Sequence, residues 1–295
     1  MHDMVNRAIS CSRRQLPILH LLTSGLCWFA AGSAQGFPPA PYFALYGTVR
    51  DQVGQTVTAD QAEVVLLKGT QEMGRTPITS GARLDQNYEL HMRLDQNRGG
   101  TTLYTEKAVA TQSPYSLAVD IGGVRYYPIE VAGNLTTGKG GERVRLDLNL
   151  GQDSDGDGLP DVWEQWQLYQ AGLYPEENGN WPISLIDRNG DFDHDGTSNW
   201  LEYVAGTFAG DATERFALEI KEKTATYARF AFFGIIGKTY TIEATTDMKT
   251  WARVPFSIGT AAAGSPSWQA QDVAIVSAFT ATGAGANQFY RLSVR

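Results

Sequence analysis

The sequence has 295 residues, with 24 basic and 32 acidic side chains, and its formal net charge is −8. This acidic balance, without any basic cluster, argues against nucleic acid as a partner. The length exceeds what one ordinary domain needs, so more than one domain is expected.

The first 34 residues have the pattern of an export signal. Three arginines precede a short apolar stretch at 16–31, and small residues follow at 32–34, which is the order of a cleaved secretory signal peptide. The apolar stretch is too short to cross a membrane as a helix, and no transmembrane segment is expected in the mature chain. We therefore predict a secreted or cell-surface bacterial protein. Adjacent Arg13 and Arg14 leave the general secretory and the twin-arginine routes both open.

Both cysteines, Cys11 and Cys27, lie inside this signal. The mature chain would therefore have no disulfide, even in an oxidising compartment. It would carry 21 basic and 31 acidic side chains, with nine of the acids in two short loops at 153–164 and 191–202. Bound metal is another means of stabilising such a chain.

Residues 41–150 carry short apolar runs separated by turn residues, which predicts an immunoglobulin-like β-sandwich. The stretch 143–150 alternates apolar and polar side chains, so one of its faces should be buried. The expected strands lie at 42–50, 62–68, 88–94, 101–108, 115–119, 124–131 and 142–150.

Residues 153–164 match a twelve-residue calcium loop of the EF-hand type. Such a loop takes side-chain oxygens from positions 1, 3, 5 and 9, a carbonyl from position 7 and a bidentate Glu from position 12, with Gly at position 6. Gly158 stands at position 6, and Pro160 fits the first turn of a helix that should end near 172–175. The expected ligands are Asp153, Asp155, Asp157, the Leu159 carbonyl, Asp161 and Glu164.

Residues 191–202 form a second loop of the same kind. Gly196 stands at position 6, and Gly206 fits the C-cap of a short helix that follows the loop. The expected ligands are Asp191, Asp193, Asp195, the Thr197 carbonyl, Asn199 and Glu202.

Acids this close repel one another unless a cation neutralises them, so both loops predict a bound ion. A cage of many protein oxygens suits Ca²⁺ better than Mg²⁺, which keeps several waters. The sequence thus predicts two calcium ions. An overlapping frame beginning at Asp187 would place Phe192 at the turn position and Ser198 at the bidentate position, so it is rejected as a primary site. Asp187 remains a candidate for a secondary contact with a metal.

Residues 215–295 return to a β pattern and predict a second, C-terminal β-sandwich. Its clearest strands are expected at 216–220, 227–233, 238–244 and 289–294.

Two resemblances to known families follow from these motifs. The opening Tyr46-Gly-Thr-Val-Arg-Asp51, with Gly54 and 62–65 after it, resembles the carboxypeptidase regulatory-like β-sandwich, which implies a secreted module without a catalytic role. The loops, each preceded by a non-helical segment and followed by a helix, resemble dockerin-type and thrombospondin type 3 repeats, which implies the same ligands. Dockerins usually carry Asp at the twelfth position, whereas these loops carry Glu164 and Glu202.

Four tryptophans surround the loops. Their positions fit either a local core against the exit helices or an aromatic platform for sugar rings, and both readings stay open. The four are Trp163, Trp166, Trp181 and Trp200.

No catalytic motif is recognisable: a G-x-S-x-G elbow, an H-E-x-x-H pair, a phosphate-binding loop and a dinucleotide fingerprint are all missing from the sequence. The predicted fold is mainly β, with two β-sandwich domains joined by a short α-containing calcium-loop segment at 151–207. The predicted function is that of a secreted, non-catalytic, calcium-binding structural or adhesion protein with a protein or polysaccharide partner. The alternatives are a dockerin-type partner-recognition protein and an accessory or catalytic component of polysaccharide degradation.

Overall fold

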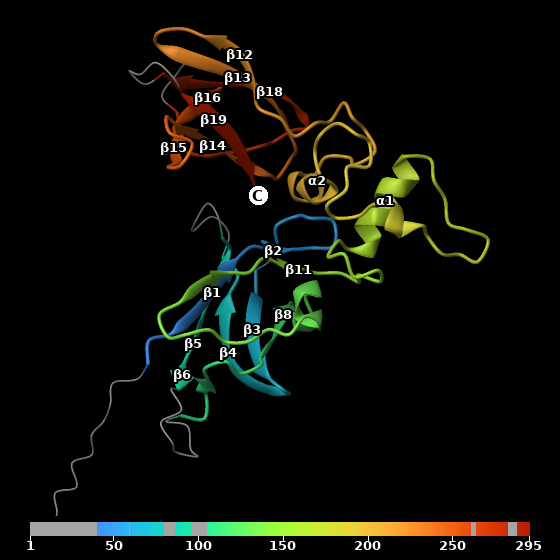
Figure 1. Cartoon of the computed structure of the whole chain (residues 1–295), viewed down its shortest axis with the longest axis vertical. Coiled ribbons are helices and arrows are strands. Elements are labelled where there is room, and N and C mark those ends of the chain that lie inside the picture. Colours follow the sequence, from blue (N-terminus) through green and yellow to red (C-terminus); the bar gives the residue numbers. More distant parts are fainter. Residues whose placement is uncertain (1–39, 59, 80–85, 96–104, 261–263, 283–287) are drawn as a thin grey trace, which may run out of the picture. The chain divides into compact units, whose positions relative to one another are not determined.

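β-Strands make up most of the regular structure, so the fold is mainly β, as the sequence predicts (Figure 1). The computed structural model describes residues 40–295 apart from 59, 80–85, 96–104, 261–263 and 283–287. The expected export signal at 1–34 lies outside the described residues. Helices in the described part are few and short, and none of them is long and apolar enough to span a bilayer.

Two sheets from the first part of the chain share one core. In the first sheet, β1 pairs antiparallel with β5 and parallel with β10; in the second, the strand order is β4-β3-β8-β9. Two short parallel pairs, β11 with β2 and β6 with β7, complete this region. The strands are β1 (Phe43–Gly47), β2 (Val49–Arg50), β3 (Ala62–Lys68), β4 (Gln71–Pro77), β5 (Tyr88–Met92), β6 (Leu94–Asp95), β7 (Val109–Ala110), β8 (Ser116–Ile121), β9 (Val124–Tyr126), β10 (Arg143–Arg145) and β11 (Leu148–Asn149).

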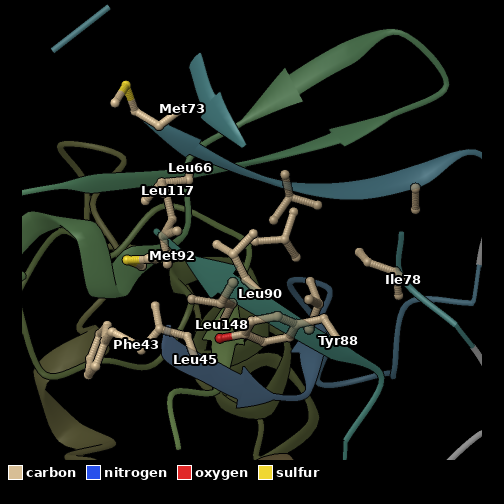
Figure 2. Close-up of a cluster of buried hydrophobic side chains, with 14 of the residues drawn as sticks. Phe43, Leu45, Leu66, Met73, Ile78, Tyr88, Leu90, Met92, Leu117 and Leu148 are labelled. Carbon is tan, nitrogen blue, oxygen red and sulfur yellow. The ribbon is translucent and has the colours of Figure 1, made fainter. Parts of the chain in front are cut away.

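The core between these sheets follows from the alternation of side chains along each strand. Leu45 of β1 and Leu90 of β5 are directly opposite one another in the register of the first sheet. Leu66 of β3 and Leu117 of β8 are opposite one another in the second sheet. All four belong to one buried cluster, and Figure 2 shows Leu66 and Leu117 reaching from one sheet toward Leu45 and Leu90 of the other.

Two further sheets share a second core. One has the order β12-β13-β18-β16, and the other has β14 between β15 and β19, with β17 also paired to β14. Phe230 and Phe232 of β13 and Tyr240 and Ile242 of β14 lie in the same buried cluster. The strands are β12 (Glu219–Lys223), β13 (Tyr227–Gly234), β14 (Thr239–Thr245), β15 (Ala252–Val254), β16 (Phe256–Ile258), β17 (Trp268–Gln269), β18 (Ala274–Ala281) and β19 (Phe289–Val294).

The segment between these sheets contains two α-helices, α1 (Asp161–Gln170) and α2 (Asn199–Ala205), and the 3-10 turn η2 (Ile183–Leu185). Pro160 stands at the N-cap of α1, where the missing N–H of proline removes no helical hydrogen bond. Gly206 ends α2 with a left-handed φ of 83°, as expected for a C-cap glycine. The two helices share a small core that contains Trp163 and Tyr203.

Residues of α2 also bond to segments far away in the sequence. The Tyr203 hydroxyl donates to the carbonyl oxygen of Asp51 at 2.8 Å. Lys238 is 1 % exposed, and its Nζ donates to the carbonyl oxygens of Gly54 at 2.6 Å and Val204 at 2.7 Å. The turn at 51–54 and the residue before β14 are therefore both attached to α2.

Several expected strands differ from the structure. The strand expected over 124–131 ends at Tyr126, and the chain continues into the 3-10 turn η1 (Ile129–Ala132) after Pro128, since proline has no N–H for a sheet ladder. The strand expected over 101–108 is wrong for 105–108, which lie in a turn and coil, while 101–104 are outside the described residues. The strands β4 and β18 were not expected.

Candidate metal centre

In loop one (residues 153–164), carboxylates of the loop accept hydrogen bonds from its own backbone. Asp153 accepts hydrogen bonds from the backbone N–H of Gly156 at 2.7 Å and Gly158 at 3.0 Å, and Asp157 accepts one from Leu159 at 2.7 Å. Gly158 has a φ of 92°, a left-handed conformation that only glycine adopts without strain. The loop therefore closes on itself and brings its acids together.

Three hydrogen bonds of loop one recur at the same positions in loop two (residues 191–202). The side chain at position 1 accepts from the backbone N–H at position 6. The side chain at position 5 accepts from the N–H at position 7, and the side chain at position 9 accepts from the N–H at position 2. The three bonds in loop two are Gly196 N to Asp191 Oδ2 at 2.9 Å, Thr197 N to Asp195 Oδ1 at 2.6 Å and Phe192 N to Asn199 Oδ1 at 3.0 Å. The matching bonds in loop one are Gly158 N to Asp153 Oδ2, Leu159 N to Asp157 Oδ1 and Ser154 N to Asp161 Oδ1.

The first three acids of each loop converge. Asp153, Asp155 and Asp157 each offer one carboxylate oxygen within 4.8 Å of the others, and the same is true of Asp191, Asp193 and Asp195. Burial first, and the neighbouring acids after it, raise the pKa of Asp155 and of Asp193. Both loops are thus able to hold a cation among clustered carboxylates.

The glutamate at position 12 of each loop is buried without a hydrogen-bond partner. Glu164 on α1 is 0 % exposed and Glu202 on α2 is 1 % exposed. Of the ten buried side-chain atoms that lack such a partner in the described residues, seven are carboxylate oxygens of the two loops. The seven are both oxygens of Glu164, both of Glu202, and one each of Asp191, Asp193 and Asp195.

The pKa values of these glutamates reflect the same environment. Burial, followed by repulsion from Asp155 and Asp157, raises the pKa of Glu164 to about 9. Burial, followed by repulsion from Asp193 and Asp195, raises the pKa of Glu202 to about 9. A divalent cation would remove both penalties by giving the buried oxygens a ligand and the acids a counter-charge. The residues therefore fit a hard cation with a bidentate carboxylate.

The side chains at position 9, Asp161 and Asn199, form hydrogen bonds with other residues in or next to their loops. Both carboxylate oxygens of Asp161 accept from Ser154, from its N–H at 2.7 Å and its hydroxyl at 2.6 Å. Asn199 accepts from Phe192 and donates from Nδ2 to the Asp187 carbonyl at 2.6 Å. Position 9 of an EF-hand loop often acts through a water molecule, and these side chains suit that indirect role.

The residues at position 7 are buried. Leu159 is 0 % exposed and Thr197 is 3 % exposed, and their N–H groups donate to Asp157 and Asp195, as described above. Their carbonyls are the predicted ligands.

Arg188 lies between the two loops and contacts residues of both. The N–H of Arg188 donates to Asp157 Oδ2 at 2.7 Å, and its carbonyl accepts from the N–H of Trp200 at 3.0 Å. The Arg188 guanidinium carbon is 3.4 Å from the centroid of the Trp200 ring. No spacing rule signals this residue, because its contacts depend on how the two loops pack together.

Asp187, the candidate for a secondary metal contact, is exposed. One of its carboxylate oxygens accepts from the N–H of Asn189 at 2.8 Å, which is a local turn of the kind that Asp commonly makes. The carbonyl of Asp187 accepts from Gly190 and from the Asn199 side chain. Its contacts are those of a residue that shapes the segment between the loops.

The four tryptophans have different environments. Trp163 is 3 % exposed, and Trp181 and Trp200 pack partly buried against the same core. Trp166 is 49 % exposed and stacks on Tyr169, with 6.1 Å between ring centroids. Three of the four thus belong to the core around α1 and α2, and Trp166 belongs to the outer surface of α1.

Comparisons with protein-family models, with curated proteins and with solved structures found no match to this chain.

Proposed function

We propose that the protein is a secreted, calcium-binding, non-catalytic structural or adhesion protein, with one calcium ion in each loop. The observation that carries this proposal is the pair of buried, unpartnered glutamates, Glu164 and Glu202. A buried carboxylate without a partner costs several kcal/mol if it is ionised. Coordination of both oxygens by a cation is the arrangement that position 12 provides in loops of this type.

Calcium is favoured over magnesium by the number and kind of ligands. Each loop offers three converging carboxylates and a buried glutamate, and Ca²⁺ accepts 6–8 oxygen ligands with variable geometry. Mg²⁺ requires near-ideal octahedral geometry and is reluctant to lose its waters. A loop that offers this many protein oxygens therefore favours Ca²⁺.

The role proposed for the ions is to rigidify the connection between the β regions. Three consecutive residues of α2 support this role. Glu202 is the proposed ligand, Tyr203 donates to the Asp51 carbonyl, and Val204 accepts from Lys238. Because one short helix makes all three contacts, an ion that fixes Glu202 would also fix the attachments to the turn at 51–54 and to the residue before β14.

The test is to follow tryptophan fluorescence and protease sensitivity of the full chain while calcium is added and then removed with EDTA. We expect calcium to change the emission of the core tryptophans and to slow cleavage within 151–207. A matched titration with magnesium should have a smaller effect at equal concentration. Emission and cleavage rates that are the same with calcium and with EDTA would refute a stabilising role.

A second candidate function, binding of a polysaccharide or protein partner, is favoured by exposed aromatic side chains on α1 and in the segment that follows it. Trp166, Tyr169 and Tyr174 are 49 %, 50 % and 66 % exposed, and Tyr169 meets Tyr174 edge to face at 5.9 Å. Trp and Tyr are enriched in binding surfaces because each combines a large apolar face with a polar atom. A glycan panel probed with the protein and with Trp166→Ala would test this; binding that is the same for both would count against this surface.

A further inference from the structure

The segment 187–190 contacts both candidate cation sites at once, and Arg188 is the residue common to both sets of contacts. On the side of loop one, its N–H donates to Asp157 Oδ2 at 2.7 Å and its Nη1 donates to the Gly158 carbonyl at 3.0 Å. A Cβ added at Gly158 would lie 2.6 Å from Nη1, so the guanidinium packs tightly against the turn of loop one. Arg188 thus holds both the position 5 ligand and the turn glycine.

On the side of loop two, the same segment holds the start of α2. The Arg188 carbonyl accepts from Trp200 N at 3.0 Å, and the Gly190 carbonyl accepts from Asn199 N at 2.9 Å. The guanidinium carbon of Arg188 lies 3.4 Å from the centroid of the Trp200 ring, a cation–π geometry that is favourable when partly desolvated. Asn199 and Trp200 lie in the first turn of the helix that carries Glu202.

We propose that Arg188 couples the two cation sites, so that an ion in either loop raises the affinity of the other loop. This inference rests on the proposed binding of one cation by each loop. An ion in loop one neutralises Asp153, Asp155 and Asp157 and fixes Asp157. Arg188 is then held in place, and the first turn of α2 is ordered before loop two binds. The protein therefore loses less conformational entropy when the second ion binds.

The coupling must be reciprocal, because linkage requires each ion to change the affinity of the other by the same factor. Coupling of this kind is about 5- to 150-fold in typical proteins. For a relay with one arginine and a few hydrogen bonds, we expect roughly 5- to 20-fold, which lies at the lower end of that range.

The coupling is measured by calcium titration of the full chain in competition with a chromophoric chelator. Glu164→Gln and Glu202→Gln each leave one functional loop, and they give the affinity of that loop alone. In the wild type, the calcium-binding curve should be steeper than two independent sites would give. The steepness should correspond to a mutual gain of about fivefold or more over the two single-loop affinities.

Arg188→Ala tests whether this residue carries the coupling. The substitution removes the guanidinium contacts with Gly158 and Trp200 and keeps the backbone hydrogen bonds of residue 188. We expect two ions to bind still, with a mutual gain in affinity well below that of the wild type. In the Glu164→Gln background, adding Arg188→Ala should leave the affinity of loop two nearly unchanged, because loop one is already disabled. If Arg188 only stabilised loop two, that affinity would fall.

Arg215 supplies a matched control. A Cβ added at Gly196, the turn glycine of loop two, would lie 3.7 Å from Arg215 Nη2, so Arg215→Ala also removes a positive charge near a loop turn. We expect Arg215→Ala to keep the steep two-ion binding.

The outcomes separate the coupling from the binding on which it rests. Absence of ion binding to the wild type overturns the proposed function. Two ions that bind the wild type with the single-loop affinities overturn the coupling alone, and this comparison stands even if Arg188→Ala does not fold. A mutual gain that is as large in a folded Arg188→Ala as in the wild type overturns the role of the Arg188 side chain.

Discussion

Lys238 Nζ donates a hydrogen bond of 2.7 Å to the carbonyl oxygen of Val204, two residues after the candidate ligand Glu202. The same nitrogen donates to Gly54 at 2.6 Å. One buried amine therefore attaches the residue before β14 both to the helix that carries Glu202 and to the turn that precedes β3. The contacts of this amine determine how stability should depend on pH.

Because the pKa of Lys238 is lowered, we expect the free energy of unfolding to rise with pH between about 7 and 10.5. Burial, followed by repulsion from Arg50, lowers the pKa of Lys238 from 10.5 to about 7, while Asp51 acts in the opposite direction. Between those values the unfolded chain binds a proton that the folded chain does not, so the free energy of unfolding increases with pH by up to about 1.4 kcal/mol per pH unit. The contribution is fully present above pH 10.5 and is lost as the pH falls to about 7.

Urea unfolding of the wild type and of Lys238→Met in saturating calcium, across this pH range, measures the effect. We expect the variant to have a flatter pH profile. We also expect it to be less stable overall, by roughly 1–3 kcal/mol for each buried carbonyl that loses its donor. Parallel profiles would show that Lys238 is not the titrating group.

The raised pKa values of Glu164 and Glu202 predict that calcium binding releases protons. With pKa values of about 9, both side chains are protonated at neutral pH before an ion binds, and a carboxylate must lose its proton to coordinate a metal. Calorimetry in buffers of different ionisation enthalpy should detect the release of up to two protons per chain. Glu164→Gln and Glu202→Gln should each remove about one of them.

The same shifts give the opposite pH dependence in the presence of a chelator. The folded pKa values lie above the usual 4.5, so this contribution to stability is fully present below pH 4.5 and is lost as the pH rises to about 9. Thermal unfolding in EDTA at several pH values checks this. Saturating calcium should abolish the trend, and a trend that persists in calcium would argue against both glutamates as ligands.

We expect a single methyl group added at Gly54 to lower the stability of the protein strongly. Its φ is 80°, and a Cβ there would collide with the backbone carbonyl of Tyr203. Gly69 is the matched control, because its φ is 60° but no atom lies within 4 Å of an added Cβ. We expect Gly69→Ala to lower stability by about 1–2 kcal/mol from the left-handed backbone alone, and Gly54→Ala to lower it considerably more. Equal losses in chemical denaturation would contradict the contact between the turn and α2.

The environments of two tryptophans predict different stability losses. Trp163 is 3 % exposed and meets Tyr203 edge to face at 5.5 Å, whereas Trp166 is 49 % exposed. Replacement of a buried large aromatic by Ala lowers stability by about 3–5 kcal/mol, and we expect Trp163→Ala to fall in that range. Surface changes usually stay within about 0.5 kcal/mol, and Trp166→Ala should lie much nearer to that value. Comparable losses would place Trp166 in the core.

The convergence of the first three acids of each loop could be predicted from the sequence because the geometry of the loops is local. Within 153–164 and 191–202 the side chains bond to N–H groups a few residues away, so spacing alone locates the acids that converge. Arg188 and Lys238 could not be found in this way, because Arg188 reaches Asp157 across 31 residues and Lys238 reaches Gly54 across 184. Packing between segments, and no local pattern, determines those contacts.

In the β regions, too, strands that depend on pairing between distant segments could not be predicted from the sequence. The strands with alternating or strongly apolar side chains, such as β3 and β13, were expected. β18 (Ala274–Ala281) was missed because three of its residues are alanine, which has a weak preference for strands. It is a strand because it pairs along its whole length with β13, and pairing between distant segments is not visible in composition.

Calorimetric titration of the full chain with calcium tests the central proposal most directly. The proposal predicts two ions per chain for the wild type and one for Glu164→Gln and for Glu202→Gln, because each substitution removes the bidentate carboxylate of one loop. Binding of no calcium by the wild type, or of two ions by both variants with unchanged affinity, would contradict it.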